Sequence, residues 1–242
     1  MNIANKTILI TGANRGIGWA LVNEALKRGA KKVYAGTRGS LQVPDERVTP
    51  ISLDVTSHSE IQRAADRVDT LDVLINDAGI SLQDDLSNPS MIHQHLAVNC
   101  FGLVNVTRAF SPLLTQSKGA VVNILSLASI ASVPFSPAYA ISKAAAFSAT
   151  QSLRMLLARK GVTVQAVFPG PVDTDMTRDL ALPKASAESV AVAIFDGLQN
   201  GDEDIFPDSM SQSIAEAWRT GVVKALERQF RAFVPQAATN LG

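Results

Sequence analysis

The sequence predicts an α/β fold in which one mainly parallel sheet is covered by helices on both faces. Three observations support this prediction. Short apolar runs alternate with amphipathic helical stretches, a glycine-rich turn joins the first run to the first helical stretch, and 242 residues suffice for one large domain. Strands that alternate with helices build parallel sheets through right-handed crossovers. We therefore expect a single domain over residues 1–242, with a doubly wound sheet of about seven strands.

The expected strands are the short runs rich in Val, Ile and Leu that buried parallel strands require. They cover residues 6–10, 32–36, 48–53, 72–75, 120–125, 162–168 and 203–206.

The expected helices lie between these runs, over residues 19–28, 57–68, 99–114 and 137–159, and Ser186 caps a further one. Ser57 and Glu60 have the spacing of a capping box, in which each side chain accepts a hydrogen bond from the other residue's backbone N–H. Residues 177–185 form an insertion that we interpret as a candidate lid. The amphipathic tail 209–233 is expected to pack on the outside as helix.

The composition is that of a globular protein with no strong charge. The 22 basic and 22 acidic side chains cancel, which argues against nucleic acid or an anionic membrane as a partner. No basic and apolar leader and no long apolar run occurs, so we expect a cytoplasmic protein. Cys100 is the single cysteine, and His93 and His95 would point away from each other on a helix, so we expect neither a disulfide nor a bound metal.

Residues 11–18 form a glycine-rich turn between the first strand and the first helix. Gly12 allows a tight turn, Gly16 lets the backbone approach a pyrophosphate, and Gly18 permits close packing of the helix. The helix N-terminus supplies N–H groups and a positive dipole, so the turn predicts a phosphate site. The alternative is an ordinary glycine-rich loop, because the spacing G-x-x-x-G-x-G differs from the G-x-G-x-x-G of most dinucleotide folds.

Tyr139 and Lys143 lie four residues apart on an expected helix, so the ammonium is placed beside the phenol. A nearby cation favours the phenolate and lowers the pKa of a tyrosine from about 10 toward the range that acid-base chemistry needs. Ser126 follows an expected strand, so its hydroxyl emerges at the carboxyl edge of the sheet, where such folds bind ligands. Taken alone, this spacing is also that of an ordinary exposed pair on a helix.

In their order and spacing, several motifs resemble those of the short-chain dehydrogenase/reductase family, over about residues 6–207. The matching positions are residues 11–18, 76–79, Asn99, Ser126, Tyr139 with Lys143, and Pro169 with Gly170. The resemblance implies a Rossmann-like domain and an NAD(P)-dependent oxidoreductase, similar to the carbonyl reductases that prefer NADP(H). Its substrate would be a ketone, an aldehyde or a ketoester and the corresponding alcohol. The alternative on the same fold is a non-catalytic NADP-binding sensor or scaffold.

The resemblance also implies roles for individual residues. Tyr139 would be the general acid or base, Ser126 would hydrogen-bond the substrate oxygen, and Lys143 would hold the nicotinamide ribose and lower the tyrosine pKa. Asn99 would bind a water molecule that relays protons to Lys143. The expected contacts with the cofactor are Gly12, Asn14, Arg15, Gly16, Ile17, Gly18, Thr37, Arg38, Asp54, Val55, Asn76, Ala78, Gly79, Tyr139, Lys143, Pro169, Gly170, Val172 and Thr174.

The chain departs from the family at Asp77, where a second asparagine is usual. An aspartate keeps acceptor capacity but loses both amide donors. We expect this change to affect local stability or cofactor affinity more than the fold.

Three finer expectations concern cofactor, substrate and assembly. The second strand is followed by Arg38 and no carboxylate, and Arg15 lies in the glycine-rich turn, so we expect NADPH to be preferred over NADH. The segments 80–82, 127–135 and 171–176 are mostly apolar, which favours a small uncharged substrate. The helices 99–114 and 138–159 carry apolar residues on more than one face, including Leu153, Leu156 and Leu157, so we expect a homodimer or homotetramer.

Overall fold

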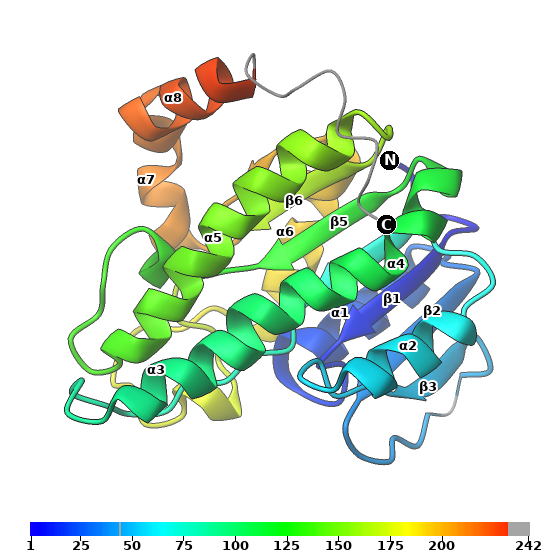
Figure 1. The fold of residues 1–242 in the computed structure, drawn as a ribbon, viewed down its shortest axis with the longest axis horizontal. Helices are drawn as coiled ribbons and strands as arrows, with labels where there is room; N and C mark the ends of the chain where they lie inside the picture. Colours follow the sequence, from blue (N-terminus) through cyan, green and yellow to red (C-terminus); the bar gives the residue numbers. More distant parts are fainter. Residues whose placement is uncertain (44, 232–242) are drawn as a thin grey trace.

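The computed structural model describes residues 1–43 and 45–231, which build one parallel sheet with helices on both faces (Figure 1). The strand order is β3-β2-β1-β4-β5-β6-β7, and each neighbouring pair is parallel. The strands are β1 (Thr7–Thr11), β2 (Lys32–Thr37), β3 (Val48–Ser52), β4 (Val73–Asn76), β5 (Ala120–Ile124), β6 (Thr163–Val167) and β7 (Asp204–Ile205). The predicted doubly wound sheet of about seven strands is confirmed.

Two helical layers cover the sheet. Helices α2, α4 and α5 lie in front of it in Figure 1, and α1 and α6 lie behind it and contact each other. The α-helices are α1 (Gly16–Lys27), α2 (His58–Asp66), α3 (Pro89–Leu96), α4 (Leu103–Ser117), α5 (Pro137–Ala158), α6 (Ala187–Asn200), α7 (Ser209–Thr220) and α8 (Val222–Phe230).

Strand β1 shows how the apolar pattern fills both layers. Ile8 and Ile10 pack into the core under α1 and α6, while Leu9 between them packs into the core under α2 and α4. Successive side chains of a strand point to opposite faces, so a continuous apolar run is what a sheet covered on both sides needs.

The helix expected over residues 99–114 is longer than predicted, because helical residues run without a break from Pro89 to Ser117 and include an irregular turn. Residues Ala97–Gly102 form a π-helical turn between α3 and α4, and α4 continues to Ser117. Gly102 permits close packing here, because a Cβ atom at this position would lie 2.7 Å from the Cγ2 of Val55. π-turns within helices are often found at functional sites, and this one contains Asn99.

The two expected helix caps differ in outcome. Ser186 accepts the backbone N–H of Ser189 at 3.1 Å, as predicted. Ser57 likewise accepts from the Glu60 N–H at 3.3 Å, but the Glu60 carboxylate accepts from the backbone N–H of Asp54 at 3.0 Å instead of that of Ser57. The predicted capping box is therefore half formed, because the Glu60 carboxylate accepts its hydrogen bond from the segment that follows β3.

Helix α8, in the predicted tail, packs with its charged face inward. Lys224 and Glu227 are 4% and 3% exposed, whereas Val222 and Phe230 are 75% and 51% exposed. Helices α7 and α8 lie at the end of the molecule next to α5 (Figure 1), and an ion pair joins Lys224 of α8 to Asp204 of β7, the last strand of the sheet. Residues 232 and 233 of the predicted tail lie outside the described residues.

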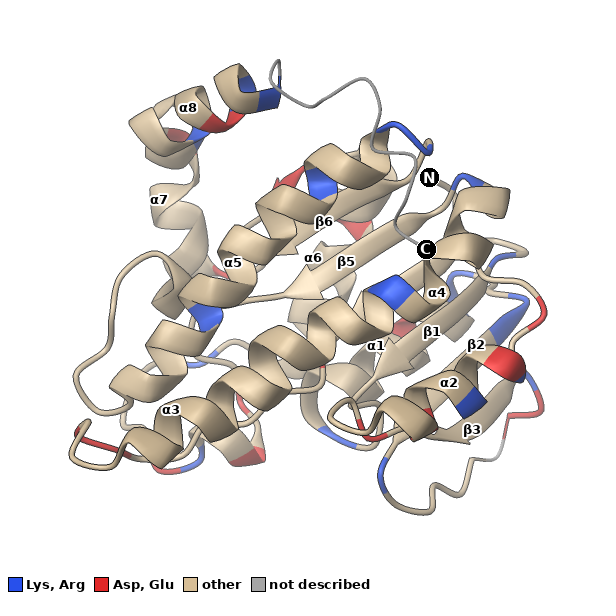
Figure 2. Cartoon of the chain, in the orientation of Figure 1, with Lys and Arg blue, Asp and Glu red and all other residues tan. Residues whose placement is uncertain are grey.

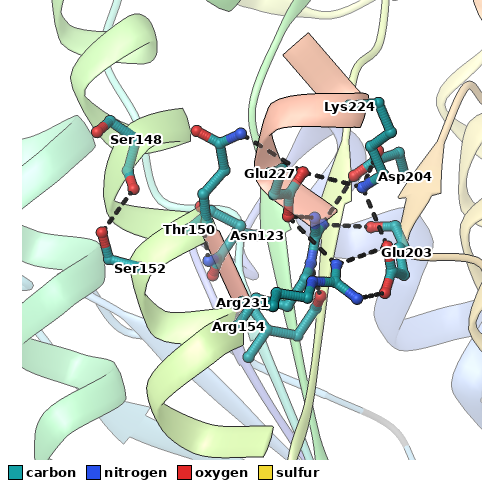
Figure 3. Close-up of polar contacts among 12 residues, drawn as sticks. Asn123, Ser148, Thr150, Ser152, Arg154, Glu203, Asp204, Lys224, Glu227 and Arg231 are labelled. Atoms are coloured by element: carbon teal, nitrogen blue, oxygen red, sulfur yellow. Dashed lines mark hydrogen bonds and ion pairs between the residues drawn. The ribbon is translucent and has the colours of Figure 1, made fainter. Parts of the chain in front are cut away.

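The reason for this orientation is a cluster of buried ions between α5, β7 and α8 (Figure 3). Arg154 on α5 pairs with Asp204 at 2.7 Å and with Glu227, and Lys224 pairs with Asp204 at 2.7 Å and with Glu227 at 3.0 Å. Burial opposes ionisation of Asp204 and Glu227, but the two cations outweigh it and hold the pKa of each carboxyl below its ordinary value. Removing any one of these charges would leave its two buried partners with one opposite charge fewer.

Within the described part of the chain, no helix is long and apolar enough to cross a bilayer. Location in the cytoplasm stays a prediction. The same residues contain no group of three or more His, Cys, Asp or Glu side chains arranged to hold a metal ion.

We predict that Arg154→Met destabilises the fold by about 3–5 kcal/mol, because the substitution keeps bulk but leaves the buried carboxylates of Asp204 and Glu227 to share the buried cation of Lys224. Urea unfolding measures this change. Arg219→Met is the matched control, since Arg219 is exposed and lies 3.9 Å from the exposed Glu216. The control should stay within about 0.5 kcal/mol of the unmodified protein. Equal losses in the two variants would contradict the role given to the ion cluster.

Candidate active site

The candidate site lies at the carboxyl edge of the sheet, between β1 and β4. The chain runs from β1 outward to β3 and then returns to place β4 on the other side of β1, so the strand order reverses here. Ligands of open α/β sheets bind in the crevice at such a reversal. The turns after β1, β2, β3 and β4 all open into this crevice.

Three glycines shape the turn between β1 and α1. Gly12 and Gly16 have φ angles of +70° and +54°, which side chains rarely adopt. A Cβ atom on Gly18 would lie 2.4 Å from the carbonyl oxygen of Gly12 and 2.7 Å from Oδ2 of Asp77. The turn and the first turn of α1 therefore fold tightly against the segment that follows β4, and Arg15, the N-cap of α1, makes no side-chain cap hydrogen bond.

A groove of about 250 Å³ runs over this turn. Its walls include most of the predicted cofactor contacts: Gly12, Asn14, Arg15, Gly16, Ile17, Thr37, Arg38, Asp54, Val55, Ala78, Gly79 and Thr174. It also includes residues that the sequence analysis did not assign to the cofactor: Leu53, Thr56, Asp77, Ile80, Val98, Asp175 and Met176. Most of these residues are sequence neighbours of a predicted cofactor contact at the end of a strand. That position in the sequence could have identified them.

Other predicted contacts do not line the groove: Gly18, Asn76, Tyr139, Lys143, Pro169, Gly170 and Val172. Asn76 shows why a motif residue can lie elsewhere. Its side-chain amide donates to Thr107 Oγ1 at 3.0 Å and to Asn123 Oδ1 at 2.9 Å, so it joins β4 to α4 and β5 inside the fold.

The four predicted catalytic residues come together next to the groove. Tyr139 lies in the first turn of α5, and its phenol and the Ser126 hydroxyl at the end of β5 form a hydrogen bond. The Nζ of Lys143 lies 5.7 Å from the centre of the Tyr139 ring and donates to the Ile124 carbonyl at 2.8 Å.

Asn99, on the π-turn, connects the segment after β4 to helix α5 through hydrogen bonds; we call this connection a clamp. Its side chain accepts from the Ile80 N–H and donates to the Ile80 carbonyl, both at 2.9 Å. It also donates to Ser142 Oγ at 2.9 Å, and Ser142 in turn donates to the backbone carbonyl of Tyr139 at 2.7 Å. The π-turn therefore fixes both a groove wall and the backbone that carries Tyr139, while the expected water relay stays a prediction.

The pKa values in the site differ from the sequence-based expectation. Burial raises the pKa of Tyr139 to about 12; the hydrogen bond from Ser126 opposes this and the charge of Asp77 adds to it. The expectation of a lowered phenol pKa is therefore wrong for this structure. Burial also lowers the pKa of Lys143 to about 8 in spite of Asp77.

Asp77 connects this acid-base group to the glycine-rich turn. Burial raises the pKa of its carboxyl to about 7, although Lys143 and the Gly18 N–H both favour the charged form. The sequence marked Asp77 as a departure from the family pattern, but it did not show that the charges of Asp77 and Lys143 act on each other.

The two predicted arginines lie differently in the groove. Arg15 pairs with Asp175 at 3.3 Å, and Asp175 also pairs with Arg178. These pairs are exposed and weak, so the arginines can exchange partners at little cost. Arg38 is exposed at the end of β2, and its charge contributes, after the hydrogen bonds from Thr56, to a lowered pKa of Asp54.

The candidate lid is held at one end. Ala185 pairs with Val172, and the Ala185 N–H donates to the Pro171 carbonyl at 3.0 Å. Whether residues 177–185 close over a ligand stays a prediction.

The sheet reversal, the glycine-rich helix start and the groove above it define a dinucleotide-binding protein of the Rossmann type. The chain belongs to the short-chain dehydrogenase family, whose model matches residues 6–185, more than half of its length. It is accordingly an NAD(P)-dependent oxidoreductase that acts on CH–OH or carbonyl groups.

Three similar proteins illustrate this relation. A short chain dehydrogenase of Burkholderia cenocepacia, solved in complex with NADP, is 35% identical with a TM-score of 0.87, covering 97% of this chain and 100% of that one. An uncharacterized oxidoreductase of Staphylococcus epidermidis is 32% identical, over 79% of this chain and 90% of the relative. The ketoacyl reductase HetN of Nostoc is 31% identical, over 84% of this chain and 78% of the relative.

We predict that Gly18→Ala destabilises the protein by about 1–3 kcal/mol, because the added methyl group overlaps the Gly12 carbonyl and the Asp77 carboxylate. Gly39→Ala is the control, since a Cβ atom there meets nothing within 4 Å. Denaturant unfolding of both variants gives the comparison. A Gly18→Ala variant as stable as Gly39→Ala would show that the turn has more space than this geometry allows.

Proposed function

We propose that this protein is an NADPH-dependent reductase that reversibly converts a ketone, aldehyde or ketoester to its alcohol by hydride transfer. The observation that carries the proposal is the hydrogen bond between Ser126 and Tyr139, with Lys143 on the same helix, directly beside a dinucleotide groove. Asn99 completes the set as the clamp that holds Tyr139 and the groove wall. The groove and the four residues Asn99, Ser126, Tyr139 and Lys143 all lie at the edge of the same sheet. We therefore propose that residues 1–242 act as one domain.

The groove suits an NADP molecule. The first turn of α1 offers backbone N–H groups and the positive end of the helix dipole to the pyrophosphate. Arg38 and Arg15 would hold the 2′-phosphate, and Lys143 would hold the nicotinamide ribose. The bound cofactor would supply the hydride. The NADP complex of the Burkholderia relative supports this assignment.

The proton of the reduction would come from Tyr139. With a pKa of about 12, the phenol is protonated at neutral pH, which is the form that a general acid requires. Ser126 would hydrogen-bond the substrate oxygen and steady the phenol that gives up the proton. The ammonium of Lys143 would stabilise the phenolate that remains.

An uncharged, hydrophobic substrate fits the surroundings of Tyr139. Leu82, Phe135 and Met176 are exposed large apolar side chains of the segments predicted to surround the substrate. The Asp84 carboxylate accepts the N–H of Ala138, next to Tyr139, at 3.1 Å, and its charge would oppose an anionic substrate. In the candidate lid, Arg178 makes an exposed, weak pair with Asp175 and Lys184 donates to the Arg178 carbonyl at 3.1 Å, so the proposal rests on the apolar side chains and on Asp84.

We also propose a homodimer or homotetramer that forms through α5. Its exposed positions are Ile141, Ala144, Ser148, Ser152, Leu156 and Ala158, none of them charged. Figure 2 shows how few charged residues α4 and α5 carry compared with the rest of the chain. Of the three leucines named as apolar residues on more than one face of this helix, Leu157 is buried in the core, Leu153 packs against the core and Leu156 is exposed on the proposed contact face.

We predict that Tyr139→Phe lowers kcat for NADPH-dependent reduction of neutral ketones by about 10² to 10⁴-fold, because it removes the transferable proton. NADPH affinity, measured by fluorescence, should change little. A panel of ketones, ketoesters and the matching keto acids, followed by NADPH absorbance, tests activity and substrate class together. Activity above about a tenth of the unmodified level would rule out Tyr139 as the acid. NADPH binding without turnover of any carbonyl would favour a sensor or scaffold.

We predict that the unmodified protein prefers NADPH to NADH and that Arg38→Asp weakens NADPH about ten to a hundredfold while relieving the bias against NADH. The new carboxylate would repel a 2′-phosphate but could accept from a free 2′-hydroxyl. The measurement is kcat/KM for both cofactors with one good ketone. Arg63→Asp, which makes the same charge change at an exposed site on α2, should leave the ratio unchanged. Equal use of the two cofactors by the unmodified protein would refute the role of Arg38.

A further inference from the structure

The carboxylate of Asp77 lies against the start of helix α1, underneath the glycine-rich turn. Gly18, in the first turn of α1, donates its backbone N–H to this carboxylate. The position is fixed from the other side by Thr11, whose Oγ1 accepts the backbone N–H groups of Asp77 and Ala78, both at 3.0 Å. Asp77 also lines the groove, so its charge faces the space proposed for the dinucleotide.

This location sets two anions in competition for one positive potential. The free N–H groups at a helix N-terminus favour a negative charge, and a pyrophosphate bound at the glycine-rich turn would depend on them. The ionised Asp77 carboxylate already uses one of these donors. The ionised carboxylate would repel a second anion at this helix start. The neutral carboxylic acid would not, so the positive helix end could then stabilise the pyrophosphate.

The other charged groups that act on Asp77 belong to α5. Lys143 favours its ionised form, and Asp77 in turn raises the pKa of Tyr139. The first turn of α1 contributes a backbone N–H, while Arg15 at its N-cap pairs with Asp175. Asn99, on the π-turn behind Gly79, is polar but uncharged.

Both protonation states of Asp77 are accessible near neutral pH. Burial raises the pKa of the carboxyl to about 7, against the opposing effects of Lys143 and the Gly18 N–H. A nearby pyrophosphate would raise this pKa further, because a like charge disfavours ionisation. The usual asparagine of the family keeps an acceptor oxygen for the Gly18 N–H and cannot ionise.

We propose that Asp77 takes up a proton from solvent when the dinucleotide binds, so that the affinity of this protein for its cofactor falls as the pH rises. The inference rests on the cofactor site of the proposed function. The step is a proton transfer alone: solvent gives a proton to a carboxylate oxygen when the cofactor binds, which forms the O–H bond of the carboxylic acid, and the proton returns to solvent when the cofactor leaves. Affinity is then full below the pKa of Asp77 in the free protein and falls above it, by up to tenfold per pH unit.

The first experiment measures the Kd of NADPH by fluorescence from about pH 6 to pH 8.5 in the unmodified protein and in Asp77→Asn. We expect the Kd of the unmodified protein to rise by about tenfold or more, and that of Asp77→Asn by less than about twofold. The same titration with NADH separates the protein from the ligand, because NADH lacks the 2′-phosphate that itself titrates in this range. Loss of the Asp77 charge also lowers the pKa of Lys143, which titrates in the same range. The pair of titrations is therefore repeated in a Lys143→Arg background, where the residue at position 143 stays charged at every pH used.

The second experiment counts the protons directly. Calorimetric titration of the unmodified protein and of Asp77→Asn with NADPH and NADH, in two buffers of different ionisation enthalpy near pH 7.5, reports the number of protons taken up. We expect a positive fraction of a proton with both ligands, and a smaller fraction in Asp77→Asn. Zero uptake, or pH curves that run parallel in the unmodified protein and Asp77→Asn, would overturn the role of Asp77 and leave the cofactor site standing. Absence of binding by either ligand at any pH would overturn the proposed function as well.

Discussion

The close contact between the glycine-rich turn and the segment after β4 is the constraint on which the site depends. A Cβ atom on Gly12 would lie 2.9 Å from the Cα of Ala78, and Gly18 has no more room. This contact closes the point where the strand order reverses, and it brings the start of α1 to the floor of the groove. Thr11 fixes the same contact by accepting two backbone N–H groups from the opposite segment.

From that contact, short connections extend to the chemistry. Ile80 follows the segment after β4, and Asn99 holds it by two hydrogen bonds. Asn99 is connected through Ser142 to the backbone of Tyr139, so the groove and the acid-base residues are positioned by one network. The π-turn that carries Asn99 departs from regular α-helical geometry, which is locally unfavourable. The hydrogen bonds of Asn99 explain why the turn is present.

Two groups of buried charges within residues 1–43 and 45–231 have opposite character. At the β7 edge, Arg154 and Lys224 face Asp204 and Glu227, and the pKa of each carboxyl stays below its ordinary value because every charge has partners. At the groove, Lys143 and Asp77 are shifted toward their neutral forms, because burial outweighs their mutual attraction. The fully paired ions at the β7 edge hold helix α8 against the sheet. Groups with pKa values near neutrality, such as those at the groove, can exchange protons, as sites of acid-base chemistry require.

The sequence by itself determined the sheet, the strand ends and the identity of the residues at the carboxyl edge. Apolar runs separated by helical stretches allow few topologies, and residues that follow parallel strands must meet at one edge. Ser126 was expected at this edge because it follows a strand, whereas the helix spacing and the family resemblance grouped Tyr139, Lys143 and Asn99 with it. The catalytic roles of these four residues stay a prediction. Tertiary structure decided what depends on distances between elements far apart in the chain. The π-turn at Asn99, the inward charged face of α8 and the pKa of Tyr139 each depend on such neighbours. Burial and the charge of Asp77 act on Tyr139 through space, and no local spacing records them.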